Sequence, residues 1–126
     1  MSINTRGTFV VSKACIPYLK EAKNPHILTI SPPMGMGDQG VNWFARFGTG
    51  YVLAKYGMTL LTHGMSKELE DYRIGCNTLW PRTMIATAAV QNLLGGDDSV
   101  NASRSPDIMA DAAYEILTSD SSKTTD

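Results

Sequence analysis

The stretch His-Ile-Leu-Thr-Ile-Ser, residues 26–31, decides how the rest of the chain is interpreted. It is short and apolar, with Asn24-Pro25 before it and Pro32-Pro33 after it. Proline has no backbone N–H to donate to a sheet, so these pairs delimit a strand. A continuous apolar run of this length predicts a buried strand rather than one with a solvated face.

Helical patterns precede and follow this strand. Apolar side chains recur at helical spacing over about residues 4–23, and Pro17 predicts a kink late in that helix. A glycine-rich loop is expected at 34–48, with aromatic residues in it. A second helix is expected over about residues 50–70.

A second strand and a last helix are expected in the remainder. The strand covers residues 74–80 and ends at Pro81, and a mixed segment covers 83–95. Ser105-Pro106-Asp107 begins the last helix, because it offers a capping hydroxyl, a proline for the first helical position and an acid in the first turn. The tail 119–126 is polar and expected to be frayed.

The order helix, strand, helix, strand, helix predicts an α/β fold with a parallel sheet covered by helices. Only two strands are visible, and a parallel pair needs cover on both faces and further strands beside it. The chain is therefore expected to form part of a larger doubly wound domain. Residues 1–118 are assigned to that domain and 119–126 to a tail.

The overall composition narrows the class of protein. The chain has 126 residues, 43% hydrophobic and 18% charged, with a net charge of −1. This balance does not favour nucleic acid or an acidic membrane surface as a partner. No apolar run approaches the ~20 residues of a membrane span, and no signal peptide is indicated. We expect an intracellular, soluble protein of the cytoplasm, or of the mitochondrion or peroxisome in a eukaryote.

The residues that commonly bind metals are scattered. Cys15 and Cys76 have no metal or redox spacing, and His26 and His63 are isolated. No metal site is expected. Two small thiols in a reducing compartment are the simpler interpretation.

Tyr51 and Lys55 are the most informative pair for function. They lie four residues apart in the second expected helix, so both side chains share one face. A free tyrosine has a pKa of about 10, and a nearby positive charge lowers it. A phenol tuned in this way exchanges a proton with a carbonyl or alcohol oxygen, as a ketone reductase requires. A hydride donor would have to come from a cofactor.

Ser31 ends the first expected strand, at the edge where open α/β sheets bind ligands. Its hydroxyl suits a substrate oxygen near Tyr51. The alternative is a simple cap or turn residue, and Tyr-x-x-x-Lys also occurs by chance. The order of these features along the chain strengthens the functional interpretation of Ser31 and of the Tyr51–Lys55 pair.

Together these segments resemble the C-terminal half of a short-chain dehydrogenase/reductase. The matching segments are Asn4-Thr5-Arg6-Gly7-Thr8-Phe9, Ser31, Tyr51-x-x-x-Lys55 and Asn77-Thr78-Leu79-Trp80-Pro81. Further strings are similar to the hydroxysteroid dehydrogenase-like protein 2 subgroup: Ile30-Ser31-Pro32-Pro33, Ala54-Lys55-Tyr56-Gly57-Met58 and Leu79-Trp80-Pro81-Arg82-Thr83. The similarity runs from about residue 2 to 118.

This resemblance implies a partial Rossmann-type fold and reversible hydride transfer between NAD or NADP and a ketone or secondary alcohol, on a lipid-like or steroid-like skeleton. Tyr51 would be the general acid/base, and Lys55 would lower its pKa and hold the nicotinamide ribose. Ser31 would bind the substrate oxygen, and Asn4 would hold a water of the proton relay. The nicotinamide pocket would be lined by Pro81, Arg82, Thr83, Ile85 and Thr87. The resemblance also implies a homo-oligomer formed through helices 4–23 and 50–70.

The chain departs from the family pattern in several places. Pro81-Arg82 replaces the usual Pro-Gly, the threonine that often follows falls one position late at Thr87, and the interval from Ser31 to Tyr51 is long. The N-terminal βαβ units that cradle the cofactor's pyrophosphate do not precede Asn4. The alternative is therefore a truncated, catalytically inactive chain that acts at most as an interaction or oligomerisation module.

A G-x-G-x-x-G string occurs at residues 35–40. In a phosphate-binding fingerprint, the strand turns directly into a helix whose N-terminus meets the phosphate. Here Pro32-Pro33 intervene, and residues 43–50 form a poor helix pattern. We interpret this stretch as part of the loop between Ser31 and Tyr51, near the substrate.

Overall fold

The computed structural model describes residues 2–32, 47–93 and 96–125 of an α/β fold. The elements, in chain order, are η1 (Ser2–Arg6), α1 (Gly7–Leu19), β1 (His26–Ile30), α3 (Thr49–Glu68), η2 (Glu70–Tyr72), β2 (Gly75–Leu79), α4 (Ala88–Leu93), α5 (Gly96–Asn101) and α6 (Asp107–Thr118). Most of the expected loop 34–48, including the string at 35–40, lies outside the described residues.

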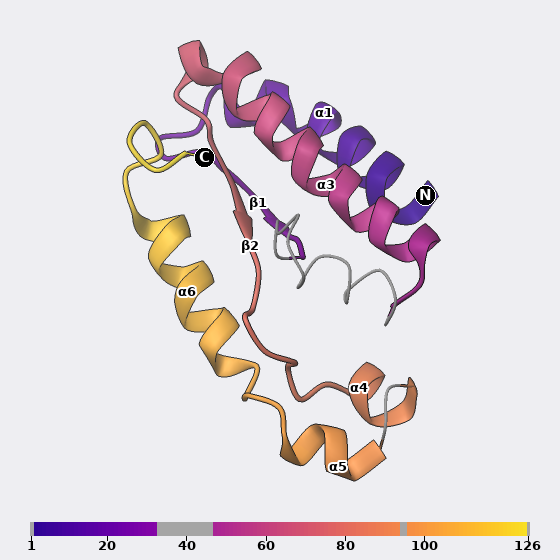
Figure 1. Ribbon diagram of the computed structural model, residues 1–126. Coiled ribbons are helices and arrows are strands. Elements are labelled where there is room, and N and C mark those ends of the chain that lie inside the picture. The colour runs from indigo at the N-terminus through magenta and orange to yellow at the C-terminus, as the bar shows by residue number, and fades with distance from the viewer. Residues whose placement is uncertain (1, 33–46, 94–95, 126) are drawn as a thin grey trace.

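The two strands form a parallel pair, as the alternation of elements predicts. Their register runs from His26 opposite Gly75 to Ile30 opposite Leu79. The pairing continues one residue past β1, where the Ser31 amide donates to the Leu79 carbonyl oxygen at 2.9 Å. Figure 1 shows α1 and α3 on one side of the strands and α6 on the other. The described part of the chain therefore has three layers.

The helix that contains Pro17 ends earlier than its apolar pattern suggests. It opens with the π-helical turn η1 and continues as α1 to Leu19, so the expected extension to residue 23 is wrong. Pro17 cannot donate a backbone hydrogen bond within the helix. The chain leaves the helix after Leu19 and turns over residues 20–24, ahead of Pro25.

The helix that carries Tyr51 and Lys55 follows its prediction closely. α3 begins after Gly48, whose φ of 79° lies in the left-handed region that glycine adopts without strain. The turn η2 follows it, and Arg73 then adopts a φ of 56° as the chain reverses into β2.

The apolar core lies toward the amino-terminal ends of the strands. It is built from Met65, Leu69, Ile74 and Cys76, with Ile16, Leu19 and Ile27 packed against it. Closer to the carboxyl ends the buried contacts become polar, because the hydroxyl of Thr62 donates to that of Thr29 at 2.8 Å. This division leaves the first turns of α3 beside the polar end of the sheet.

The expected mixed segment 83–95 forms part of a helical hairpin. α4 and α5 pack on each other, and the chain enters and leaves this pair through a parallel bridge between Ile85 and Arg104. α6 begins close to its predicted start, and the Ser105 hydroxyl accepts from the Asp107 amide at 3.2 Å.

The C-terminal tail is not frayed, and that expectation is wrong. Ser121 is only 5% exposed, and its amide donates to the Asn24 side-chain oxygen at 2.9 Å. Asn77 donates its side-chain amide to the Thr124 carbonyl oxygen at 2.8 Å, and the Cys76 amide donates to the Thr125 hydroxyl at 3.2 Å. Polar side chains thus fasten the tail both to the start of β1 and to β2. A domain boundary at residue 118 stays a prediction.

Within the described ranges, none of the helices combines the length and the apolar character that crossing a membrane requires.

Candidate active site

Tyr51 and Lys55 lie one turn apart at the beginning of α3, as the helical spacing predicts. The Tyr51 side chain is 48% exposed, and its ring centroid lies 6.4 Å from that of Phe47 at a tilt of 42°. The Lys55 ammonium turns toward the sheet and donates to the Ile30 carbonyl oxygen at 2.6 Å. Partial burial removes water from this ammonium and lowers the pKa of Lys55 from its usual 10.5.

Ser31 follows β1 directly, beside the residue that Lys55 contacts. Its side chain is 3% exposed, and its hydroxyl has no hydrogen-bond partner among the residues that the structure describes. A buried polar group without a partner costs free energy, so it needs an explanation. The Ser31 hydroxyl can still form a hydrogen bond with a group outside the described residues.

Asn4 is half-buried in the π-helical turn η1. Its neighbour Thr5 donates its hydroxyl to the Ala54 carbonyl oxygen at 2.9 Å, and Ala54 precedes Lys55. Single hydrogen bonds therefore join η1 to α3, and α3 to the end of β1. The segments that carry Asn4, Lys55 and Ser31 meet at one end of the sheet.

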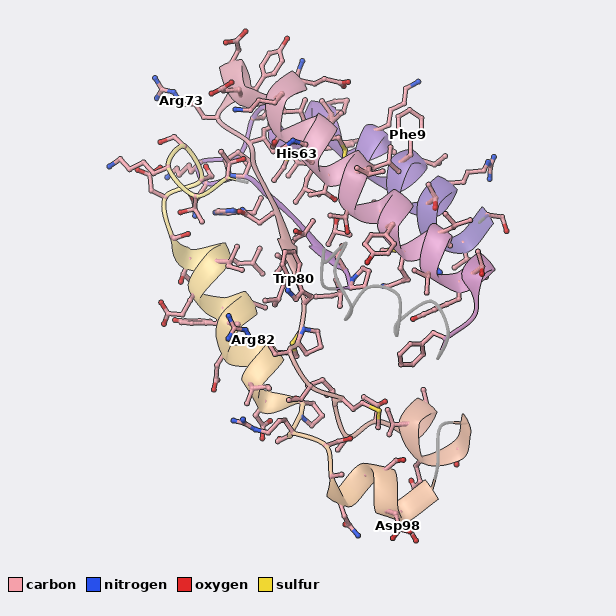
Figure 2. All side chains as sticks on the ribbon, viewed as in Figure 1. Phe9, His63, Arg73, Trp80, Arg82 and Asp98 are labelled. Carbon is pink, nitrogen blue, oxygen red and sulfur yellow. The ribbon has the colours of Figure 1, made fainter. Side chains whose placement is uncertain are left out.

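The residues after β2 divide into two groups. Pro81 is half-buried and lies close to the strand end that is paired with Ser31, whereas Arg82 and Thr83 are exposed. Figure 2 shows Trp80 and Arg82 in the connection that leaves β2.

Ile85 and Thr87 have local structural contacts. Ile85 forms the bridge with Arg104, and the Thr87 hydroxyl accepts from the Val90 amide at 3.4 Å, which caps α4. These contacts lie within the connection from β2 to α4 and its bridge to the segment before α6.

Sequence reasoning missed the contact between η1 and α3. A β-carbon on Gly57 would lie 2.6 Å from the Thr5 hydroxyl oxygen, so only glycine allows the two helices to approach so closely here. A glycine inside a helix weakens the helix. Its presence at position 57 was therefore the one sign in the sequence from which a close contact could have been predicted.

An open groove of about 540 Å³ lies elsewhere, between η1, α1 and α3. It is lined by Ser2, Thr5, Arg6, Phe9 and Leu61. Its lining is almost entirely apolar and includes neither Ser31 nor Tyr51. The groove therefore belongs to the helical face and not to the strand ends.

Among the described residues, histidine, cysteine and acidic side chains do not gather into groups of three that would hold a metal ion. Cys15 is exposed and Cys76 is buried, and both are free thiols.

Comparison with known proteins identifies the family. The short chain dehydrogenase family matches residues 1–97. The chain is 51% identical over 118 residues to hydroxysteroid dehydrogenase-like protein 2 of Xenopus laevis, covering 94% of this chain and 27% of that protein. It is 48% identical over 117 residues to the protein of the same name from Homo sapiens, again covering 27% of that relative. The chain thus spans about a quarter of the length of these curated relatives.

Solved structures agree with the sequence comparison. A short chain dehydrogenase from Mycobacterium thermoresistibile is 53% identical with a TM-score of 0.80, over 97% of this chain and 42% of that one. A putative dehydrogenase from Xanthomonas campestris is 45% identical with a TM-score of 0.82, over 98% of this chain and 43% of that one. The predicted fold class and resemblance are confirmed, and this chain belongs to the short-chain dehydrogenase family.

Proposed function

We propose that this chain is the acid–base portion of an oxidoreductase that transfers hydride between NAD or NADP and a ketone or secondary alcohol. The observation that carries the proposal is the juxtaposition at the end of β1. There the Lys55 ammonium bonds to the Ile30 carbonyl oxygen at 2.6 Å, beside the buried hydroxyl of Ser31, which has no hydrogen-bond partner among the described residues. Family membership supports the reaction class.

The proton transfer follows from the chemistry of these side chains. In the reductive direction Ser31 donates a hydrogen bond to the carbonyl oxygen of the substrate, and Tyr51 gives that oxygen its phenolic proton. Lys55 stabilises the phenolate that remains, because a nearby positive charge favours the ionised form. A water held by Asn4 returns a proton to Tyr51 along the relay.

The residues present fit a nicotinamide cofactor. An ammonium has three donors, so the bond from Lys55 to Ile30 leaves two for ribose hydroxyls or the tyrosine. Pro81, Arg82 and Thr83 follow the neighbouring strand and would line the same side of the pocket, with Ile85 and Thr87 further along the chain. The cofactor would supply the hydride that none of these side chains can provide.

For the substrate we propose a carbonyl or secondary alcohol on a lipid-like or steroid-like skeleton. The name hydroxysteroid dehydrogenase-like protein 2, carried by the Xenopus laevis and Homo sapiens relatives, supports this choice. Phe47 beside Tyr51 would give such a skeleton an apolar contact.

A specific observation favours a second function, an oligomerisation module built on the helical face. Val11 and Tyr18 on α1 are 63% and 79% exposed, and the apolar groove lies along η1 and α3. Exposed apolar surface of this kind marks interaction sites. We propose that a second copy of the chain covers this face, with or without catalysis.

The catalytic proposal is tested in a grafted enzyme, in which residues 2–125 of this chain replace the matching segment of the Mycobacterium thermoresistibile dehydrogenase. Dehydrogenase activity is measured with NADH and NADPH on a panel of hydrophobic ketones. We expect Tyr51→Phe to lower kcat by about 10²-fold or more, the contribution typical of general acid–base catalysis.

Tyr114→Phe is the matched control, because Tyr114 is exposed on α6. Equal kcat for Tyr51→Phe and Tyr114→Phe would refute the assignment of Tyr51. A grafted enzyme without activity on any ketone would count against the oxidoreductase. In that case a dimer in analytical ultracentrifugation that Tyr18→Glu dissociates would favour the module.

A further inference from the structure

A close contact between η1 and α3 lies one residue from two of the proposed active-site residues. Thr5 follows Asn4 and donates its hydroxyl to the carbonyl oxygen of Ala54, which precedes Lys55. Ala54 is almost completely buried, so water does not compete for that oxygen. The bond therefore fixes the turn that carries Asn4 against the turn that carries Lys55.

Gly57 makes this approach possible. A β-carbon there would lie 2.6 Å from the Thr5 hydroxyl oxygen and 2.8 Å from its methyl carbon, and real β-carbons do not show such distances. The φ of Gly57 is not positive, so the position needs the missing side chain and not the special backbone freedom of glycine. Gly64 on the same helix differs, because a β-carbon there would meet nothing within 4 Å.

The shape of η1 adds a second constraint. Residues 2–6 form a π-helical turn, a rare conformation that occurs often at functional sites. Asn4 and Thr5 both belong to this turn, so the side chain that touches α3 and the amide proposed for the proton relay move together.

We propose that Thr5 and Gly57 form a positioning pair that sets the separation between Asn4 and the Tyr51–Lys55 face of α3. This inference rests on the proposed function and deepens it. Neither residue touches the reacting atoms. Their effect on the reaction passes through the spacing of η1 and α3, which sets how close the Asn4 water lies to Lys55 and the phenol on α3.

The contact itself is tested by urea unfolding of the full chain. Alanine at a free helical position normally stabilises, so Gly64→Ala is expected to raise the unfolding midpoint. Gly57→Ala is expected to lower it, and Thr5→Ala/Gly57→Ala to recover most of the loss, because the double variant removes both atoms that lie closest to the new methyl group. Equal midpoints for Gly57→Ala and Gly64→Ala would refute the contact.

The positioning role is tested by kcat and KM in the grafted enzyme. We expect Gly57→Ala to lower kcat about tenfold with little change in KM, because the wider spacing moves the Asn4 water out of the proton relay and leaves the substrate contact of Ser31 in place. Thr5→Val keeps the side-chain shape without the donor and should also lower kcat, whereas Thr5→Ser keeps the donor to Ala54 and should leave kcat close to that of the native chain. Thr5→Val also guards against a Gly57→Ala variant that fails to fold.

An unfolding effect without any loss of kcat in Gly57→Ala or Thr5→Val would overturn the positioning role, since a purely structural contact would behave in that way. Failure of the proposed function has a different signature. In that case Tyr51→Phe leaves turnover intact, while the Thr5→Ala/Gly57→Ala double variant still recovers most of the unfolding midpoint that Gly57→Ala loses.

Discussion

Lys55 on α3 donates a hydrogen bond to Ile30, the last residue of β1, and its ammonium lies 2.6 Å from the Ile30 carbonyl oxygen. The Ile30 backbone already belongs to the sheet, so the contact joins helix and strand at the point where Ser31 begins. The same contact draws the ammonium into a partly buried position, where its charge is less well hydrated.

The first prediction concerns Lys55 and pH. Its folded pKa is lowered, so between that value and the usual 10.5 the unfolded chain binds more protons than the folded chain. This residue therefore makes stability rise with pH across that window. Urea unfolding at several pH values, with Lys55→Met as reference, measures the difference. The unfolding free energy of the native chain should rise relative to that of Lys55→Met as the pH increases. A difference that stays constant with pH would contradict the prediction.

Cys76 has the opposite pH dependence. Burial raises the pKa of its thiol from 9.0 to about 11, so the unfolded chain loses this proton first. Stability from this group is complete below pH 9 and is lost as the pH rises from 9 to about 11. Unfolding of Cys76→Ala should lack this alkaline loss, and an identical loss in both proteins would assign it to another group.

The two thiols should also differ in reactivity. Cys15 is exposed and Cys76 is buried, and the neutral thiol is a poor nucleophile. A thiol-disulfide reagent at pH 8 should label Cys15 rapidly and Cys76 only as fast as the chain opens. Cys15→Ser is the control, and it should remove the fast phase alone. Rapid labelling of that variant would show that the β2 segment is accessible.

Asn24 should be the main attachment of the C-terminal tail. Its amide nitrogen donates to the Ser119 carbonyl oxygen at 2.9 Å, and its amide oxygen accepts from the Ser121 amide at 2.9 Å. We expect Asn24→Ala to cost about 1–2 kcal/mol of unfolding free energy, since each such bond contributes roughly 1 kcal/mol. Hydrogen exchange should become faster over residues 119–125. Asn101→Ala on exposed α5 is the matched control, and equal exchange in the two variants would contradict the attachment.

The buried hydroxyl pair should show strong coupling. The hydroxyls of Thr62 and Thr29 are hydrogen-bonded at 2.8 Å, and that of Thr62 also contacts the Met58 carbonyl oxygen at 3.0 Å, so Thr62→Val leaves the buried Thr29 hydroxyl without its partner and should cost about 1–3 kcal/mol. The double variant Thr29→Val/Thr62→Val removes both polar groups and should cost less than the sum of the two single changes. Urea unfolding of the four proteins measures the coupling, and additive effects would show that the bond contributes little.

Local patterns predicted much of the backbone. The β-branched run at 26–31 and the apolar spacing over 50–70 gave β1 and α3 within two residues at each end. Both patterns report burial of a face, which the sequence carries directly. The pattern failed at residues 20–23, where the chain turns ahead of Asn24-Pro25 instead of continuing α1, and in the tail, where polarity suggested disorder although Ser121 is buried.

The candidate site likewise has one part that the sequence predicted and another that only the folded structure shows. The order Asn4, Ser31, Tyr51, Lys55 along strands and helices was visible in the amino acids, because motif spacing and periodicity are local properties. The contacts that assemble the site were not visible. The bonds Lys55–Ile30, Thr5–Ala54 and Ser121–Asn24 join residues 25, 49 and 97 positions apart. No local preference encodes such a partner, since each pairing exists only after the helices have packed on the sheet.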